Sequence, residues 1–149
     1  MVMALEPDDS PGFLLWHATL RWQRGIAAAL APLDLTHPQF VLLAGLWWLG
    51  REGGRPNQLE LAQYTGTDVK TASQVLRRLE AKEFLTRQVD EADTRMKRLA
   101  ITERGVEVAV RAVEVVERAD AEFFAAAPDL AAVLAVLRPL AKRYSAQPN

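Results

Sequence analysis

The residues best suited to chemistry lie between positions 67 and 85, where polar side chains gather on one side of an expected helix. They are Lys70, Thr71, Ser73, Gln74, Arg77 and Arg78. Small donors and acceptors near a helix N-terminus suit hydrogen bonds to base edges in a major groove. Arginines further along the same helix suit the flanking phosphates. The alternative interpretation is a charged helix face that contacts only water.

The helix itself is predicted from its apolar spacing. The residues that recur at intervals of three and four positions are Ala72, Val75, Leu76 and Leu79. This spacing places them on one face, which predicts an amphipathic helix. Gly66 interrupts the chain before it, and Thr67 or Asp68 offers an oxygen to the free N–H groups of the first turn.

The segments on either side predict the supporting elements. Upstream, Asn57 and Glu60 have the spacing of a capping box for a short helix over 57–63, and a glycine-containing turn follows at 64–67. Two short helices joined in this way predict a helix-turn-helix. Downstream, residues 85–90 and 98–101 alternate apolar and polar side chains around a charged loop, which predicts a β-hairpin wing.

The combined pattern over residues 59–105 resembles the MarR family of bacterial transcriptional regulators. The wing and its exit carry the resemblance in the motif Asp93-x-Arg95, followed by Leu99-x-Ile101-Thr102-x-x-Gly105. The chain departs from the family at Glu83, just after the polar helix, where the family usually has Gly. Because Gly adopts a left-handed C-cap without steric cost, Glu83 implies a strained or differently shaped exit.

The resemblance implies a dimer that binds a palindromic site on double-stranded DNA as a repressor or activator. It implies that the helix beginning near Thr67 enters the major groove and that Arg95 enters the adjacent minor groove. Asp93 is expected to orient Arg95, because a carboxylate repels phosphate; the alternative is an ordinary ion pair in a turn. Lys97 completes the expected DNA-binding residues. Many members of the family respond to small phenolic or lipophilic molecules, so the resemblance also implies a small-molecule effector.

The rest of the chain predicts helices only, so the fold class is mostly α with a small β-hairpin. Helices are expected from Ser10-Pro11 to about Leu33, over 40–49, from 102 to about 127, and over 129–144. We expect one domain over 1–149, with a winged helix-turn-helix at 57–101 between dimerisation helices at 10–35 and 102–145. The first and last helices carry more apolar surface than one protomer buries, which predicts that a second copy covers part of it.

All four tryptophans lie between positions 16 and 48, outside the predicted DNA-binding unit. Large rings with an N–H group suit planar ligands. The candidate effector pocket therefore comprises Trp16, His17, Trp22, Trp47 and Trp48, with Gly45 as the expected opening. The alternative is that these rings fill the core and the dimer interface.

Composition narrows the remaining classes of function. The net charge is −1, while residues 66–98 carry eight Lys and Arg against six Asp and Glu, so any DNA binding must come from local charge. Cysteine is absent, and neither histidine accompanies a carboxylate cluster, so we expect no metal, no cofactor and no enzyme activity.

No 18-residue apolar run and no basic leader occur, which predicts a cytoplasmic protein without a membrane span. The alternative function is a winged-helix module for protein interaction that does not bind DNA.

Overall fold

The computed structural model describes residues 5–142. Its elements, in chain order, are a 3-10 turn Pro7–Asp9, α1 Pro11–Leu30, a 3-10 turn Ala31–Leu33, α2 His37–Arg51, α3 Gln58–Thr65, α4 Val69–Ala81, β1 Leu85–Val89, β2 Lys97–Ile101, α5 Glu103–Phe124 and α6 Leu130–Ala141. The prediction of a mostly helical fold with one small β-hairpin is confirmed. The expected boundaries hold within a few residues, and Tyr144 at the end of the last expected helix lies outside the described residues.

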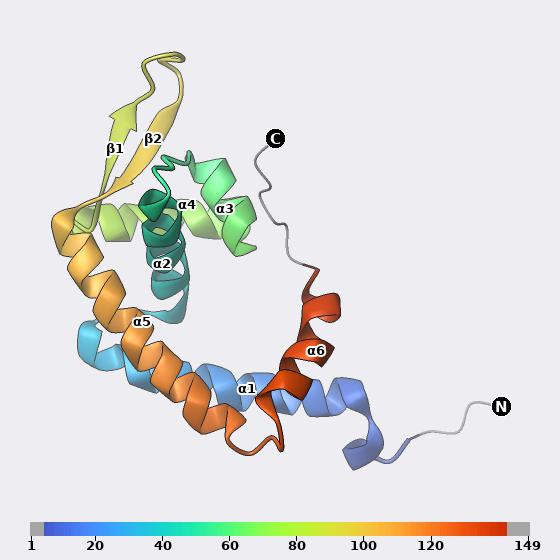
Figure 1. The fold of residues 1–149 in the computed structure, drawn as a ribbon. Coiled ribbons are helices and arrows are strands. Elements are labelled where there is room, and N and C mark those ends of the chain that lie inside the picture. Colours follow the sequence, from blue (N-terminus) through green and yellow to red (C-terminus); the bar gives the residue numbers. More distant parts are fainter. Residues whose placement is uncertain (1–4, 143–149) are drawn as a thin grey trace.

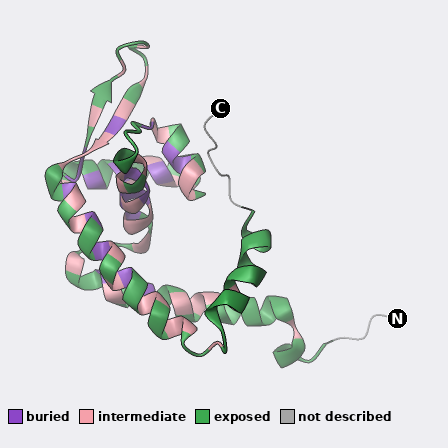
Figure 2. Ribbon diagram, viewed as in Figure 1, coloured by how far each residue is buried: buried purple, intermediate pink, exposed green. Residues whose placement is uncertain are grey.

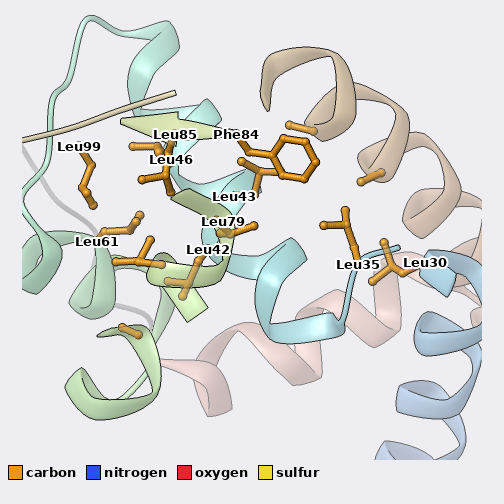
Figure 3. Packing of buried hydrophobic residues seen from close by; sticks show 14 of the residues in the cluster. Leu30, Leu35, Leu42, Leu43, Leu46, Leu61, Leu79, Phe84, Leu85 and Leu99 are labelled. Carbon is orange, nitrogen blue, oxygen red and sulfur yellow. The ribbon is translucent and has the colours of Figure 1, made fainter. Parts of the chain in front are cut away.

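Helices α1 and α5 pack side by side as a long base, while α2, α3, α4 and the hairpin form a compact body at one end (Figure 1). The core of this body is made mainly of leucines from all of its elements (Figure 3). Central α2 contributes Leu42, Leu43 and Leu46, all at most 1% exposed. Ile26 and Leu30 of α1 and Ala109, Ala112 and Val116 of α5 belong to the same core, so the body and the base share it.

Helix starts and ends follow the local sequence. Thr36 and Gln39 form the predicted capping box of α2, and Asn57 and Glu60 form that of α3. Gly66 ends α3 in the left-handed conformation at φ 72°, which an L side chain rarely adopts, so the chain turns sharply into α4.

The hairpin pairs β1 with β2 in antiparallel register, with Leu85 opposite Ile101 and Val89 opposite Lys97. Leu99 donates its backbone N–H to the carbonyl of Pro56 at 2.8 Å, so the segment before α3 adds a further hydrogen bond to β2. We define the wing as β1, β2 and the loop 90–96. It projects from the body beside the helix-turn-helix (Figure 1).

The chain leaves the wing through a close contact at the start of α5. Thr102 caps this helix by accepting the N–H of Gly105 at 3.0 Å. A Cβ on Gly105 would lie only 2.0 Å from the carbonyl oxygen of Phe84. Glycine is therefore required where α5 passes the segment that follows α4, and this close contact joins the base to the body.

The two ends of the described chain leave apolar side chains uncovered. Helix α6 stands apart from the body, and none of the residues in Leu130–Ala141 is buried (Figures 1 and 2). The first half of α1 is also exposed, including Phe13, Leu14, Leu15 and Trp16. Within one protomer α1 and α5 pack together, but α6 does not join them.

Within residues 5–142, no single helix is both long and apolar enough to cross a membrane. The segments Pro11–Leu33 and His37–Arg51 reach that threshold only when they are joined, and the chain bends by 74° between them.

Candidate nucleic-acid interface

Helix α4 begins at a well-formed cap. Asp68, one of the two predicted N-caps, accepts the backbone N–H of Thr71 at 2.9 Å. Hydrogen bonds from the hydroxyl and the N–H of Thr71 lower the pKa of Asp68. The carboxylate therefore stays ionised at the positive end of the helix dipole, where negative charge is stabilising.

The two faces of α4 divide as the apolar spacing predicts. Ala72, Leu76 and Leu79 are fully buried. On the other side, Lys70, Gln74, Arg77 and Arg78 are exposed, whereas Thr71 and Ser73 are half-buried. Arg77 Nη2 donates to Ser73 Oγ at 3.4 Å, so the serine orients the guanidinium as well as offering a hydroxyl of its own.

The wing tip holds the predicted Asp93–Arg95 pair. Asp93 Oδ1 accepts both the backbone N–H of Arg95 at 3.1 Å and its Nε at 3.2 Å. The Arg95 side chain is nevertheless 90% exposed, so its remaining donors face outward. Lys97, at the first position of β2, is exposed as well.

Sequence reasoning missed the network at the base of the wing. Arg98 donates from Nε to Asp90 Oδ2 at 2.6 Å and from Nη1 to Glu60 Oε1 at 2.7 Å. The hydrogen bond from Arg98, followed by those from the N–H groups of Ala92 and Asp93, lowers the pKa of Asp90. Arg98 therefore ties the wing to the first turn of α3 and is already occupied by carboxylates.

Two further cations near α4 are also occupied. Arg87 Nε lies 3.6 Å from Glu80 Oε2, and Lys82 Nζ donates to the carbonyl of Asp34 at 2.6 Å. Among residues 5–142, the cations of this segment without a carboxylate partner are Lys70, Arg77, Arg78 and Lys97. The positive charge that is free to meet a polyanion is thus concentrated on α4 and at the start of β2.

The exit from α4 has the strained geometry expected from Glu83. Its φ is 63°, in the left-handed region that favours glycine. Its carbonyl accepts the Thr102 hydroxyl at 2.7 Å, and its carboxylate lies 3.4 Å from Arg104 Nη1. Contacts with the start of α5 therefore hold an unfavourable backbone conformation in place.

The second candidate site, named here the tryptophan pocket, is a cavity of about 570 Å³ between α1, α2, α3 and α5. Trp22, Trp47 and Trp48 line it together with Phe40, Tyr64 and Val113. Its size is in the range of small-molecule sites.

The structure does not bring all of the predicted pocket residues together. Trp16 is 63% exposed, and His17 contacts Phe13 edge to face with ring centroids 4.5 Å apart; neither lines the tryptophan pocket. Gly45, the expected opening, does line the pocket, but a Cβ there would lie 2.8 Å from Thr65 Cγ2. Gly45 thus lets α3 approach α2 closely.

Comparison with known proteins identifies the family. The MarR family model matches residues 35–97. The HTH-type transcriptional regulator YdcH of Bacillus subtilis is 43% identical over 136 residues, which cover 91% of this chain and 92% of the relative. The HTH-type transcriptional repressor Rv2887 of Mycobacterium tuberculosis is 34% identical over 79% of this chain and 83% of its own length.

Solved structures agree with this assignment. The M. tuberculosis MarR family protein Rv2887, solved in complex with salicylic acid, matches with a TM-score of 0.69 and 32% identity, covering 91% of this chain and 99% of that chain. The transcriptional repressor CouR of Rhodococcus jostii RHA1, solved on a 23-mer DNA duplex, has a TM-score of 0.80 at 24% identity and covers 94% of this chain and 100% of its own, which shows a shared fold. This chain therefore belongs to the MarR family of helix-turn-helix transcriptional regulators.

Proposed function

We propose that this regulator is a homodimer that binds a palindromic site on double-stranded DNA and represses transcription. Helix α4 of each protomer lies in a major groove, and each wing reaches the neighbouring minor groove. The observation that carries this proposal is the division of α4 into one fully buried face and one exposed face whose cations have no carboxylate partner.

Each predicted residue has a role in this arrangement. The residues near the α4 N-terminus that face base edges are Lys70, Thr71, Ser73 and Gln74. The residues that hold phosphates are Arg77, Arg78 and Lys97. Arg95 enters the minor groove, and Asp93, which accepts two of its N–H groups, orients it.

The dimer is supported by the exposed apolar side chains of the dimerisation helices proposed at 10–35 and 102–145. Leu130, Val136 and Leu140 of α6 are between 57% and 69% exposed, which is unusual for such side chains in an isolated domain. Residues 143–145 lie outside the described residues. Sedimentation of the full chain at micromolar concentration is expected to show a dimer, and a well-behaved monomer would contradict this assignment.

We further propose that a small aromatic or lipophilic effector binds in the tryptophan pocket and releases the DNA. The pocket lies between the base helices and the helix-turn-helix, and the relative Rv2887 has been solved with salicylic acid. A ligand there acts only through a difference in its affinity for the DNA-bound and the free conformations. The proposal includes no catalytic step and places the protein in the cytoplasm with its DNA.

The direct test is the salt dependence of binding to duplex DNA, measured by fluorescence anisotropy. Each phosphate contact contributes about −0.9 to the slope of log K against log salt concentration. A dimer that uses Arg77, Arg78 and Lys97 is expected to show a steep slope, and the triple substitution of these residues by Met should flatten it. Salt-independent or absent DNA binding would instead favour the protein-interaction alternative.

A further inference from the structure

We infer that the tryptophan pocket selects neutral planar aromatic molecules that carry a hydrogen-bond acceptor, and that it discriminates against aromatic acids. This inference rests on the proposed function, because it concerns the pocket assigned there to the effector. It goes beyond that assignment because it specifies the charge of the ligand.

The first argument is the chemistry of the lining. Ten residues line the pocket, six of them from α2, and none of the ten carries a charged side chain. A carboxylate seated against this lining loses part of its hydration and finds no counterion among the lining residues. An amide, ester or ketone of the same shape loses much less.

The second argument is the charge held behind the wall of the pocket. Trp22, which lines the pocket, donates its Nε1–H to Asp120 Oδ1 at 2.7 Å. The group supporting this ring is therefore an anion, which repels a ligand carboxylate. The His37 ring meets the same ring edge to face, with centroids 5.1 Å apart, and burial lowers the pKa of its imidazole, which favours the neutral form.

The third argument concerns Arg51, a cation that lies close to the pocket without lining it. Its guanidinium carbon lies 5.1 Å from the ring centroid of Trp47 and 5.3 Å from that of Trp48. Arg51 lines a separate hollow with Trp48 and Glu52. Arg51 is therefore engaged with the two indole rings and is not itself a lining residue of the pocket.

The fourth argument is the hydrogen-bonding capacity of the lining. The Trp22 N–H already donates to Asp120, and the Thr65 hydroxyl already donates to the carbonyl of Leu61 at 3.0 Å. Within residues 5–142, the indole N–H groups of Trp47 and Trp48 make no hydrogen bond. Because an indole N–H is a donor only, a ligand that complements them must bring an acceptor.

The test compares acid and amide pairs on the full-length protein at neutral pH, by isothermal titration calorimetry. The pairs are benzoate with benzamide and salicylate with salicylamide, so that shape is nearly constant and charge changes. The amide of each pair is expected to bind tighter by on the order of tenfold or more. Equal or tighter binding of the acids, or binding of neither member of both pairs, would overturn the inference. DNA binding measured without ligand tests the proposed function separately.

A charge swap provides the matched control. Ala44 lines the pocket and is half-buried, so Ala44→Lys places a cation in it, whereas Ala44→Met adds length without charge. The Lys variant is expected to reverse the preference in favour of the acids, and the Met variant to retain the preference for amides. Arg51→Gln is expected to leave the ratio of the two affinities unchanged. A Lys variant that binds ligand without reversal, or an altered ratio in Arg51→Gln, would show that the selection has another origin.

Discussion

Arg98 Nη1 lies 2.7 Å from Glu60 Oε1, and this ion pair joins the second strand of the wing to the first turn of α3. The same guanidinium holds Asp90 at the start of the wing loop, at 2.6 Å from Nε. Asp90 in turn accepts the backbone N–H groups of Ala92 and Asp93. Arg98 thus sets the position of the wing loop relative to the helix-turn-helix.

The first prediction separates this positioning role from phosphate contact. Arg98→Met should weaken binding to the selected DNA site by a factor on the order of three to ten, because the wing loses its attachment. The salt slope should stay within about half a unit of the original, because Arg98 contacts carboxylates.

Lys97→Met is the matched control for Arg98→Met. Lys97 is exposed and has no carboxylate partner among the described residues, so its loss should flatten the slope by about one unit. Equal changes of slope in both variants would show that Arg98 contacts phosphate.

The second prediction concerns the strained exit from α4. Glu83→Gly should raise the free energy of unfolding by about 0.5–1 kcal/mol, because glycine relieves the cost of φ 63° while the exposed ion pair with Arg104 contributes little. Ala81→Gly, at the last residue of α4, should bring no such gain, because Ala81 has no left-handed backbone to relieve. Chemical denaturation measures both, and destabilisation by Glu83→Gly would mean that the Glu83 side chain outweighs the backbone strain.

The third prediction distinguishes the role of Arg95, which senses the width of the minor groove, from that of Arg77, which binds phosphate. Arg95→Ala should weaken binding by about 1–3 kcal/mol and reduce the preference for narrow, A·T-rich flanks. Arg77→Ala should weaken binding nearly equally on all sequences and flatten the salt slope by about one unit. Binding to a panel of flanking sequences checks both, and a changed base preference in Arg77→Ala would reverse the assigned roles.

The fourth prediction follows from His37, whose pKa is lowered by burial, against an opposing contribution from Asp120. As pH falls through about 6.5, His37 binds a proton more readily in the unfolded chain than in the folded protein. The free energy of unfolding should therefore decrease. His37→Asn should make the free energy of unfolding less dependent on pH between about 7.5 and 5.5. His17→Asn, on the exposed part of α1, is the control; an equal effect of both variants would contradict the role of burial at His37.

Local signals predicted much of the DNA-binding unit. The capping boxes at Thr36 and Asn57 and the cap at Asp68 depend on residues three positions apart, so the sequence displays them directly. The left-handed backbone at Glu83 followed from one departure from the family pattern.

Contacts between distant segments were not predicted. Arg98 meets Glu60 across 38 positions, and Lys82 meets Asp34 across 48, so the count of eight Lys and Arg in residues 66–98 could not show that these two are occupied. The tryptophans were grouped by closeness in sequence, but α1 turns Trp16 away from the pocket that Trp22 lines. Gly45 lines the pocket as expected, but no local pattern shows that α3 also packs closely against it.

The most direct measurement of the central claim is selection of bound duplexes from a random DNA pool by the full-length protein. Two copies of α4 related by a two-fold axis must meet the same side of the duplex, so the selected motif should be an inverted repeat with half-site centres about 10 base pairs apart. A motif without dyad symmetry, or no enrichment at all, would contradict the account.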